Sequence, residues 1–380
     1  MSFELSEELK LLRDMVRDFV AKELLPLEEQ VEEADDVPPD VLRRLRTRAR
    51  DLGLLGLNIP AECGGAGLGM LANCILREEL GRTSLAMSYT IRGPSPVLSL
   101  GTPAQREKYL APCLRAEKRD SFALTEPNAG SDAAAISTTA ARDGDHFILN
   151  GTKIFVTDGQ KADFAIVFAV TDKEKRAQGG ITAFLVDKGT PGFRVGALFK
   201  KMGWRGTDLA ELVFTDCRVP AESVLGEVGQ GFAIAMKWID QGRLGVAAAA
   251  VGTAERLLEM ASQYARQRVT FGKPLADRQA IQWMIADSAT EIAAARLLVY
   301  QAAGEGDRGR NVRSQAAMAK LYASEMVGRV ADRTLQIHGG MGYMKELPIE
   351  RMYRDVRYTR IAEGTSEILR HLIARGILKG

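Results

Sequence analysis

The chain has 380 residues, which is long for one domain, and 46% of them are hydrophobic, enough for a sizeable core. Its 51 basic and 49 acidic residues leave a net charge of +2, so no overall field favours nucleic acid or an anionic membrane. No apolar run approaches membrane-spanning length. The 4 cysteines and 3 histidines lack paired spacing, so we expect reduced thiols in a cytoplasmic protein and neither disulfides nor a metal site.

The first third of the chain has the residue spacing of helices. Met1–Ser6 carries an early acid and no apolar segment, which predicts the start of a helix and no export or import signal. From Leu5 to about Arg119 the apolar residues recur at helical spacing. Gly64–Gly69 resembles a dinucleotide-binding loop, but Met70 stands where the third glycine belongs and no strong strand precedes it. A turn between helices is the better interpretation.

Between about Asp120 and Pro220 the apolar period falls to two or to short apolar runs. Asn150–Gly151 lies between two apolar triplets and predicts a β-hairpin, because these two residues accept the positive φ angles of a tight turn. Further strands are predicted over residues 164–170, 181–186 and 209–214.

From about Gly231 onward helical spacing returns in long segments, one of them from Gln315 to Ile337. Long helices with short links predict a bundle. The order of helices, strands and helices predicts an α+β chain that is mainly α. We expect an N-terminal helical domain over residues 1–120, a central β-domain over 121–229 and a C-terminal bundle over 230–380.

A carboxylate, Glu363, stands in a short loop directly before the last predicted helix, in the tract Ala362–Ile368. Thr365 or Ser366 can cap the start of that helix. Two glycines can end it, Gly376 and Gly380. For an isolated glutamate, a favourable interaction with the positive end of the helix would be explanation enough.

A second tract, Ala123–Asp132, runs from a short strand into small polar residues. Such residues expose backbone amides and hydroxyls, which suits a flat polar ring such as a flavin, although an ordinary turn is the alternative. Together with the Glu363 loop, this tract resembles the acyl-CoA dehydrogenase family, flavoenzymes whose catalytic base is a glutamate in such a loop. The resemblance implies FAD as cofactor and a C-terminal four-helix bundle after the helical and β-domains.

The resemblance also implies two groups of FAD contacts. In the first group the Thr125 hydroxyl lies near the pyrimidine side of the ring, Phe155 covers one ring face and Thr157 stands beside N5. This group comprises Phe122, Leu124, Thr125, Gly130, Ser131, Phe155 and Thr157. The second group, which in the family reaches the FAD of a neighbouring subunit, comprises Arg268, Phe271, Gln279, Gln336, Gly339 and Gly340. Thr365 and Glu367 complete the match near the middle of the cofactor.

Four contacts to the substrate are implied, from Ser131, Asp240, Arg243 and Gly364. The segment Asp240–Arg243 is expected to open a long helix. Some family members carry their base on this helix and lack one in the C-terminal loop. Here the helix position is Gly242, so Glu363 is the predicted base.

The activity implied is α,β-dehydrogenation of an acyl-CoA thioester to a trans-2-enoyl-CoA, in fatty acid or amino acid catabolism. Electrons would pass to an electron-transfer flavoprotein, and the protein would be a homo-oligomer, most simply a tetramer. Two alternatives share the fold: an acyl-CoA oxidase, usually a much longer chain, and an enoyl-CoA reductase working in reverse. DNA-associated relatives add a basic C-terminal domain, which this nearly neutral sequence does not show.

Two departures from the family pattern bear on the acyl group. Ala362 stands where many members have a bulky tyrosine, which predicts a wider pocket beside the α and β carbons. Arg92 falls where relatives mostly place apolar residues along the acyl tail, and a carboxylate on the acyl group could pair with it there. The alternative is that Arg92 points to solvent or to another subunit. We expect short-to-medium or branched acyl groups, with a carboxylated or ring-bearing group as the second hypothesis.

Overall fold

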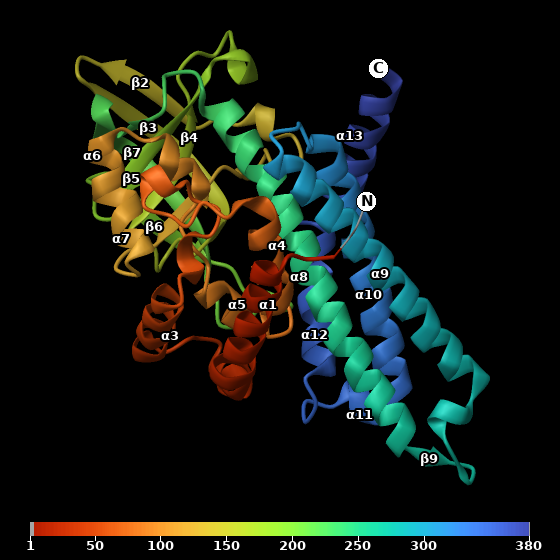
Figure 1. Cartoon of the computed structure of the whole chain (residues 1–380). Coiled ribbons are helices and arrows are strands. Elements are labelled where there is room, and N and C mark those ends of the chain that lie inside the picture. The colour runs from red at the N-terminus through yellow and green to blue at the C-terminus, as the bar shows by residue number, and fades with distance from the viewer. Residues whose placement is uncertain (1–3, 380) are drawn as a thin grey trace.

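The computed structural model describes residues 4–379 and has three consecutive parts, helical, β and helical, as predicted (Figure 1). The first part contains α1 (Glu7–Phe19), α2 (Glu28–Ala34), α3 (Pro39–Asp51), α4 (Gly69–Leu80), α5 (Leu85–Thr90), α6 (Pro103–Gln105) and α7 (Ala111–Leu114). The Ser6 hydroxyl caps α1 by accepting from the Leu9 amide at 3.3 Å, so this helix begins at Glu7. Met1–Phe3, the rest of the predicted helix start, lie outside the described residues.

The glycine-rich tract Gly64–Gly69 is a turn that leads into α4, as predicted. A Cβ atom added at Gly65 would lie 2.2 Å from the Ile59 carbonyl oxygen, so this glycine allows a close backbone approach. The tract therefore serves packing.

The central part is one sheet of β1 (Asp120–Ala123), β2 (Thr139–Asp143), β3 (His146–Thr157), β4 (Phe164–Val170), β5 (Ile181–Asp187), β6 (Phe193–Leu198), β7 (Leu209–Pro220) and β8 (Val224–Leu225). The strand order is β6-β7-β3-β2-β4-β5-β8, and β1 pairs in parallel with β4. Neighbours β3 and β7, and β4 and β5, pair antiparallel, and β4 and β5 are almost wholly buried. The sheet is therefore covered on both faces at its centre.

The hairpin predicted at Asn150–Gly151 is wrong, because β3 runs straight through both residues. The sharp turn comes earlier, at Gly144 between β2 and β3. A register shift in the pairing of β3 with β7 falls at Gly151, whose Cβ would lie 2.4 Å from the Thr138 hydroxyl oxygen. The glycine thus serves a bulge and a close approach rather than a turn.

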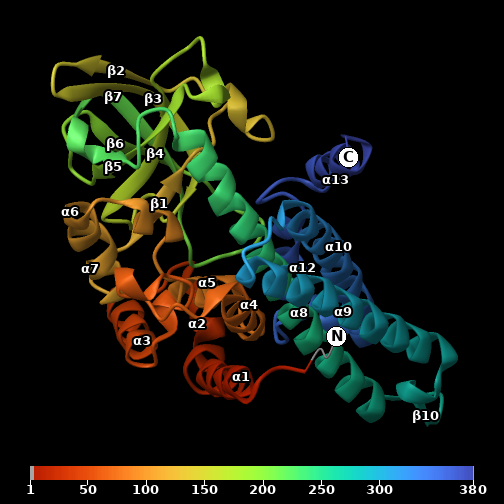
Figure 2. The same ribbon diagram turned by 45° about the horizontal axis from the view of Figure 1, so that its top comes forward.

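The last part contains α8 (Gly231–Gln267), the short strands β9 (Val269–Thr270) and β10 (Lys273–Pro274), α9 (Gln279–Asp307), α10 (Arg313–His338), α11 (Gly340–Tyr343), α12 (Ile349–Val356) and α13 (Ser366–Lys379). Helix α8 runs from the sheet to the far tip of the bundle, with the N-terminal helices on one side and α9 and α10 on the other (Figure 2). Buried alanines such as Ala248, Ala295 and Ala319 let α8, α9 and α10 pack closely.

Two details of the predicted helices are wrong. Asp240–Arg243 lies inside α8 and does not open it, because the apolar face of the helix already begins at Gly231 and includes Ile234. Gly376 does not end α13, which continues to Lys379. Gly380 lies outside the described residues.

Candidate active site

The Glu363 loop joins a helical turn at Arg357–Arg360 to α13 and is held from two helices. Glu363 and Gly364 both have positive φ, +55° and +97°, which gives the sharp bend before α13. From α8, Arg243 Nε donates to the Glu363 carbonyl oxygen at 3.1 Å. From α10, Lys320 Nζ donates to the Gly364 carbonyl oxygen at 2.7 Å. The position of the loop is thus fixed by two buried cations.

Gly242 makes room for the Glu363 carboxyl group. A Cβ at residue 242 would lie 2.9 Å from Glu363 Cδ and 3.0 Å from Oε2, and 2.9 Å from a ring carbon of Trp238. The carboxyl therefore lies directly against the backbone of α8. Residue 242 on the helix and residue 363 in the loop, the two alternative positions of the base in the family, are therefore in contact.

Burial raises the pKa of Glu363 to about 7, because it disfavours the charged form more than Arg243 and Lys320 favour it. The Glu363 carboxyl accepts no hydrogen bond, and its backbone N–H donates none, within residues 4–379. A carboxyl with such a pKa is protonated and deprotonated near neutral pH, which suits a general base.

Lys320 was missed in the sequence analysis. It is fully buried, burial lowers the pKa of its ammonium group to about 8, and its neighbours on α10 include Ala316, Ala319 and Ala323. A single lysine on an otherwise apolar helix face is the signal that could have found it, since a buried cation needs a partner.

The tract Phe122–Asp132 is held against β3. The Ile154 amide donates to the Thr125 carbonyl oxygen at 2.9 Å, and Lys153 Nζ donates to the Leu124 carbonyl oxygen at 3.1 Å. Lys153 also forms a buried ion pair with Glu126 at 2.7 Å. This pair, which sequence reasoning missed, brings the two predicted flavin elements together.

Glu126 continues this network into the next segment. It accepts from the backbone amides of Ser137 at 2.7 Å and Thr138 at 2.9 Å. The Lys153 ammonium beside it helps to hold the pKa of this carboxyl at about 2, against the effect of burial. The ionised Glu126 therefore ties the loop after residue 126 to the sheet, while Gly130 and Ser131 remain exposed.

Near this loop, the aromatic ring of Phe155 is exposed, whereas that of Phe122 packs on another ring. Phe155 has a positive φ of +55°, lies at an irregularity in β3 and is 54% exposed. Phe122 stacks on Trp238 of α8 with ring centroids 4.7 Å apart, and Trp238 also borders Gly242. The buried Trp238 Nε1 has no hydrogen-bond partner among the described residues. Trp238 therefore joins the predicted flavin tract to the base, and a ligand could complete its hydrogen bond.

The second group of predicted FAD contacts lies far from this place, at the tip of the bundle near β9 (Figure 1). The six predicted contacts in this group, Arg268, Phe271, Gln279, Gln336, Gly339 and Gly340, are exposed. The ends of α8 and α10 meet there, where Tyr264 stacks on His338 with centroids 4.3 Å apart, so His338 has a packing role. Gly242 of α8 and Arg268, the residue directly after the end of this helix, are 26 positions apart, which at 1.5 Å per residue is about 39 Å.

Arg92, the predicted contact for a carboxylated acyl group, has an internal partner among the described residues. Arg92 NH1 lies 3.3 Å from Asp120, which also accepts from the Ser95 amide, so the guanidinium is paired inside the protein. Asp240 similarly pairs with Arg243 at 2.6 Å, and both side chains support the base loop.

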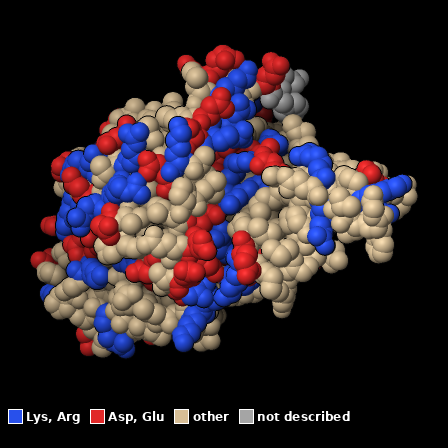
Figure 3. Space-filling model, turned by 90° about the horizontal axis from the view of Figure 1, so that it is seen from below, with Lys and Arg blue, Asp and Glu red and all other residues tan. Residues whose placement is uncertain are grey.

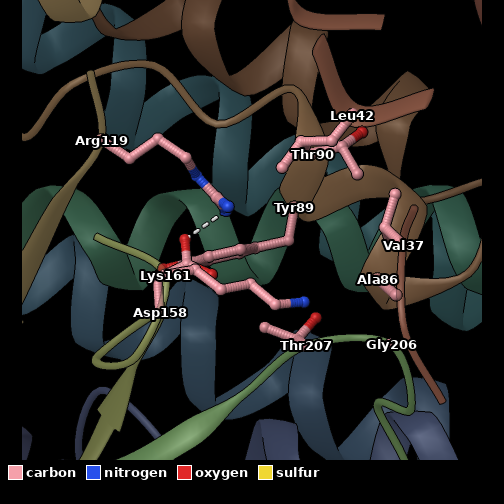
Figure 4. A pocket seen from close by; sticks show the side chains of 10 residues that line it. All are labelled: Val37, Leu42, Ala86, Tyr89, Thr90, Arg119, Asp158, Lys161, Gly206 and Thr207. Carbon is pink, nitrogen blue, oxygen red and sulfur yellow. Dashed lines mark hydrogen bonds and ion pairs between the residues drawn. The ribbon is translucent and has the colours of Figure 1, made fainter. Parts of the chain in front are cut away.

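A small cavity lies where the N-terminal helices meet the sheet (Figure 4). Tyr89, Lys161, Thr207 and the ion pair between Arg119 and Asp158 line it. Its volume of about 10 Å³ has room for about one water molecule. This cavity is therefore part of the packing between domains and is not a ligand site.

Models of one family match the chain from end to end. The acyl-CoA dehydrogenase N-terminal domain matches residues 6–117, the middle domain residues 121–217 and the C-terminal domain residues 229–378. The chain therefore belongs to the acyl-CoA dehydrogenase family of flavoproteins and is an oxidoreductase.

Individual relatives cover the whole chain. It is 44% identical over 385 residues to an acryloyl-CoA reductase (NADH) of Anaerotignum propionicum, covering 100% of this chain and 96% of the relative. It is 43% identical over 383 residues to the mitochondrial short-chain specific acyl-CoA dehydrogenase of Homo sapiens, covering 100% and 92%. A solved structure described as the electron transferring flavoprotein of Acidaminococcus fermentans matches with a TM-score of 0.94 and 41% identity, covering 100% of both chains.

Two expectations about other partners can be compared with the structure. No helix among residues 4–379 combines the length and apolar character needed to cross a membrane. The same residues bring together no group of His, Cys, Asp and Glu side chains suited to a metal ion, and the four cysteines are free thiols.

Proposed function

We propose that this protein is an FAD-dependent acyl-CoA dehydrogenase that converts an acyl-CoA thioester into a trans-2-enoyl-CoA. The observation that carries the proposal is Glu363, a carboxyl whose pKa is raised to about 7 and which lies against the bare backbone at Gly242. A saturated thioester is a weak acid at its α carbon, so the reaction needs a positioned base of this kind.

The loop supplies two groups to the reaction. The Glu363 carboxylate accepts the α-proton of the thioester. The Glu363 backbone N–H, which has no partner within residues 4–379, donates to the thioester carbonyl oxygen as negative charge develops there. Arg243 and Lys320 hold the backbone of the loop in place through the two carbonyl oxygens on either side of this turn.

The residues around the base fit a flavin ring. Phe155 presents an aromatic face that is more than half exposed, and Trp238 Nε1 is a buried donor without a partner in the part of the chain that the structure describes. The Thr125 and Thr157 side chains lie on the adjoining loop and strand end. We assign the contacts with the ring to Phe122, Leu124, Thr125, Gly130, Ser131, Phe155, Thr157, Thr365 and Glu367. The flavin, when bound, supplies the acceptor for the hydride that leaves the β carbon.

The protein is proposed to act as a homo-oligomer, a tetramer in its simplest form, in the cytoplasm. Two parts of the predicted FAD site lie about 39 Å apart along one straight helix, so one chain cannot bring both to one cofactor. The tip exposes apolar side chains, including Phe271 at 97% and Tyr343 at 73%. Seen from below, the projecting end of the bundle has broad areas without charged residues, as an interface between copies would have (Figure 3).

Electrons are proposed to pass to an electron-transfer flavoprotein, which the likeness to the Acidaminococcus structure supports. A second candidate function is reduction of an enoyl-CoA, favoured by the 44% identity to an acryloyl-CoA reductase. The two functions use the same base and differ in direction. Both functions imply short acyl groups, in line with the relative that is named a short-chain specific acyl-CoA dehydrogenase.

The test is a visible spectrum of the purified protein, followed by anaerobic addition of butyryl-, isobutyryl- and octanoyl-CoA. We expect the absorbance of bound flavin and its bleaching by the shorter acyl-CoAs. Absence of flavin from protein purified and refolded with FAD, or no bleaching by any acyl-CoA, would contradict the proposal. Reoxidation by an electron-transfer flavoprotein, compared with oxygen and with NADH-linked turnover of an enoyl-CoA, separates dehydrogenase, oxidase and reductase.

A further inference from the structure

A carboxylate on α10 contacts the chain on both sides of the Glu363 loop. Glu325 Oε1 accepts from the Ser366 hydroxyl at 2.7 Å, and Glu325 Oε2 pairs with Arg360 Nε at 3.2 Å. Arg360 lies three residues before Glu363, and Ser366 lies three residues after it. One side chain therefore fixes both the position at which the loop begins and the position at which it ends.

The Arg360 side chain lies against the bare backbone of α10 at Gly328. A Cβ atom added at Gly328 would lie 2.2 Å from Arg360 NH2 and 3.0 Å from Cζ. Gly328 follows Glu325 by three residues, so the two share one face of the helix. The guanidinium is therefore held by packing as well as by charge, unlike an ion pair between two freely exposed side chains.

The contact of Glu325 with Ser366 is buried and is separate from the capping of α13. Ser366 is 3% exposed and is the first residue of this helix. The cap comes from Thr365, whose hydroxyl accepts from the Ile368 amide at 3.3 Å. The Ser366 hydroxyl is thus free to donate to Glu325, and this bond ties the first turn of α13 to α10.

The same helix holds the middle of the loop through Lys320, which donates to the Gly364 carbonyl oxygen at 2.7 Å. Lys320 and Glu325 are five residues apart, about 7.5 Å along the axis of α10. Between these contacts Glu363 has a φ of +55°, a conformation that is strained for a residue with a side chain and persists where the surroundings hold it. The contacts from α10 supply this restraint before, within and after the turn.

We propose that Glu325 is a positioning residue for the base. By holding Arg360 and Ser366, it keeps the Glu363 carboxyl and the Glu363 backbone N–H directed at the same thioester. The inference rests on the proposed function, in which the carboxyl takes the α-proton and the N–H donates to the carbonyl oxygen. Both groups belong to one residue, so a small rotation of the loop displaces both at once. A displacement of about 1 Å from the productive geometry can lower a rate about 100-fold.

The first arm of the test measures proton removal without hydride transfer. Acetyl-CoA has α-protons and no β carbon, so it cannot be dehydrogenated, and enzyme-catalysed exchange of its α-protons with D2O reports the base alone. We expect this exchange, followed by NMR on the holoenzyme, to be roughly 10- to 100-fold slower per bound flavin in Glu325→Ala. With butyryl-CoA, kcat should fall by a similar factor while KM changes less than about threefold, because substrate binding is not affected.

The second arm separates the two contacts of Glu325. Arg360→Met and Ser366→Ala each remove one contact, and we expect each to slow the exchange of acetyl-CoA roughly 3- to 10-fold. Arg360→Met added to Glu325→Ala should have little further effect, because their shared contact is already lost. Arg329→Met is the matched control: Arg329, also on α10, pairs with Glu291 of α9 at the same distance of 3.2 Å, and its loss should leave the exchange unchanged.

Exchange at the wild-type rate per bound flavin in Glu325→Ala would overturn the inference, even with a lower melting temperature, because Glu325 would then serve stability alone. If Glu325→Ala yields no folded flavoprotein, Arg360→Met and Ser366→Ala decide, and wild-type rates in both would overturn it. The wild-type reactions separate the two proposals. Exchange of acetyl-CoA and bleaching by butyryl-CoA, with no effect of the substitutions, reject the role of Glu325 alone, whereas no exchange and no bleaching by any acyl-CoA reject the proposed function with it.

Discussion

The predicted sites at the two ends of helix α8 differ in whether one chain supplies the partners of their residues. Near its start, Gly242 and Arg243 meet the Glu363 loop, and Arg243 and Lys320 of the same chain favour the charged form of Glu363. Near its end, Arg268 is exposed and its side chain makes no ion pair among residues 4–379. The proposed base is therefore held in place by residues of its own chain, whereas the FAD contacts proposed at the tip require a ligand or a second copy.

The largest effect on the site near the start of α8 is expected from Glu363→Gln. The amide keeps the shape of the side chain and cannot accept the α-proton, so we expect acyl-CoA-dependent flavin bleaching to slow by roughly 10³-fold or more. Flavin content should stay at the wild-type level, because the Glu363 side chain is not among the proposed FAD contacts. Bleaching near the wild-type rate, measured by anaerobic stopped flow, would mean that another base operates.

The next largest effect is expected from Gly242→Ala. The new methyl group would lie 2.9 Å from Glu363 Cδ and displace the carboxyl, so we expect a roughly 10- to 100-fold lower kcat with butyryl-CoA. Gly245→Ala is the matched control, since its methyl group would meet only Arg77 Cγ at an ordinary 3.8 Å. Equal effects of the two substitutions on butyryl-CoA turnover would contradict the proposed position of the base.

A smaller and more specific effect is expected from Lys320→Met. The carboxylate form of Glu363 is the active form, so kcat/KM should rise with pH through about 7 in the wild type. Lys320 lowers the pKa of Glu363, so its removal should move the acid limb of the pH profile to higher pH. A shift to lower pH, or no shift in a variant with full flavin content, would show that Lys320 does not act on the base.

The sequence predicts those parts of this molecule that depend on local pattern. The helix–strand–helix order follows from apolar spacing, and the Glu363 loop follows from a carboxylate placed before a capped helix. The hairpin prediction at Asn150–Gly151 fails because glycine suits a β-bulge as well as a tight turn. The contact that requires glycine here is with Thr138, which lies outside the local sequence pattern.

Long-range pairings account for the remaining differences. Arg92 is paired by Asp120, whereas Arg77 has no ion pair among residues 4–379, although both are arginines in the same helical third of the chain. Lys320 and Lys153 act through backbone carbonyl groups 44 and 29 positions away. Such partners are set by tertiary packing, which spacing and composition do not encode.

The comparison between the two ends of α8 is tested most directly by mixing two inactive variants. Glu363→Gln lacks the base and Arg268→Ala lacks the tip contact, for which we expect weaker FAD binding. If each site takes its base from one chain and its tip contact from another, dissociated and reassembled mixtures should recover about a quarter of wild-type activity, because half of the pairs are mixed and one of their two sites is intact. No recovery, in mixtures shown by native mass spectrometry to contain hybrid oligomers, would contradict the account.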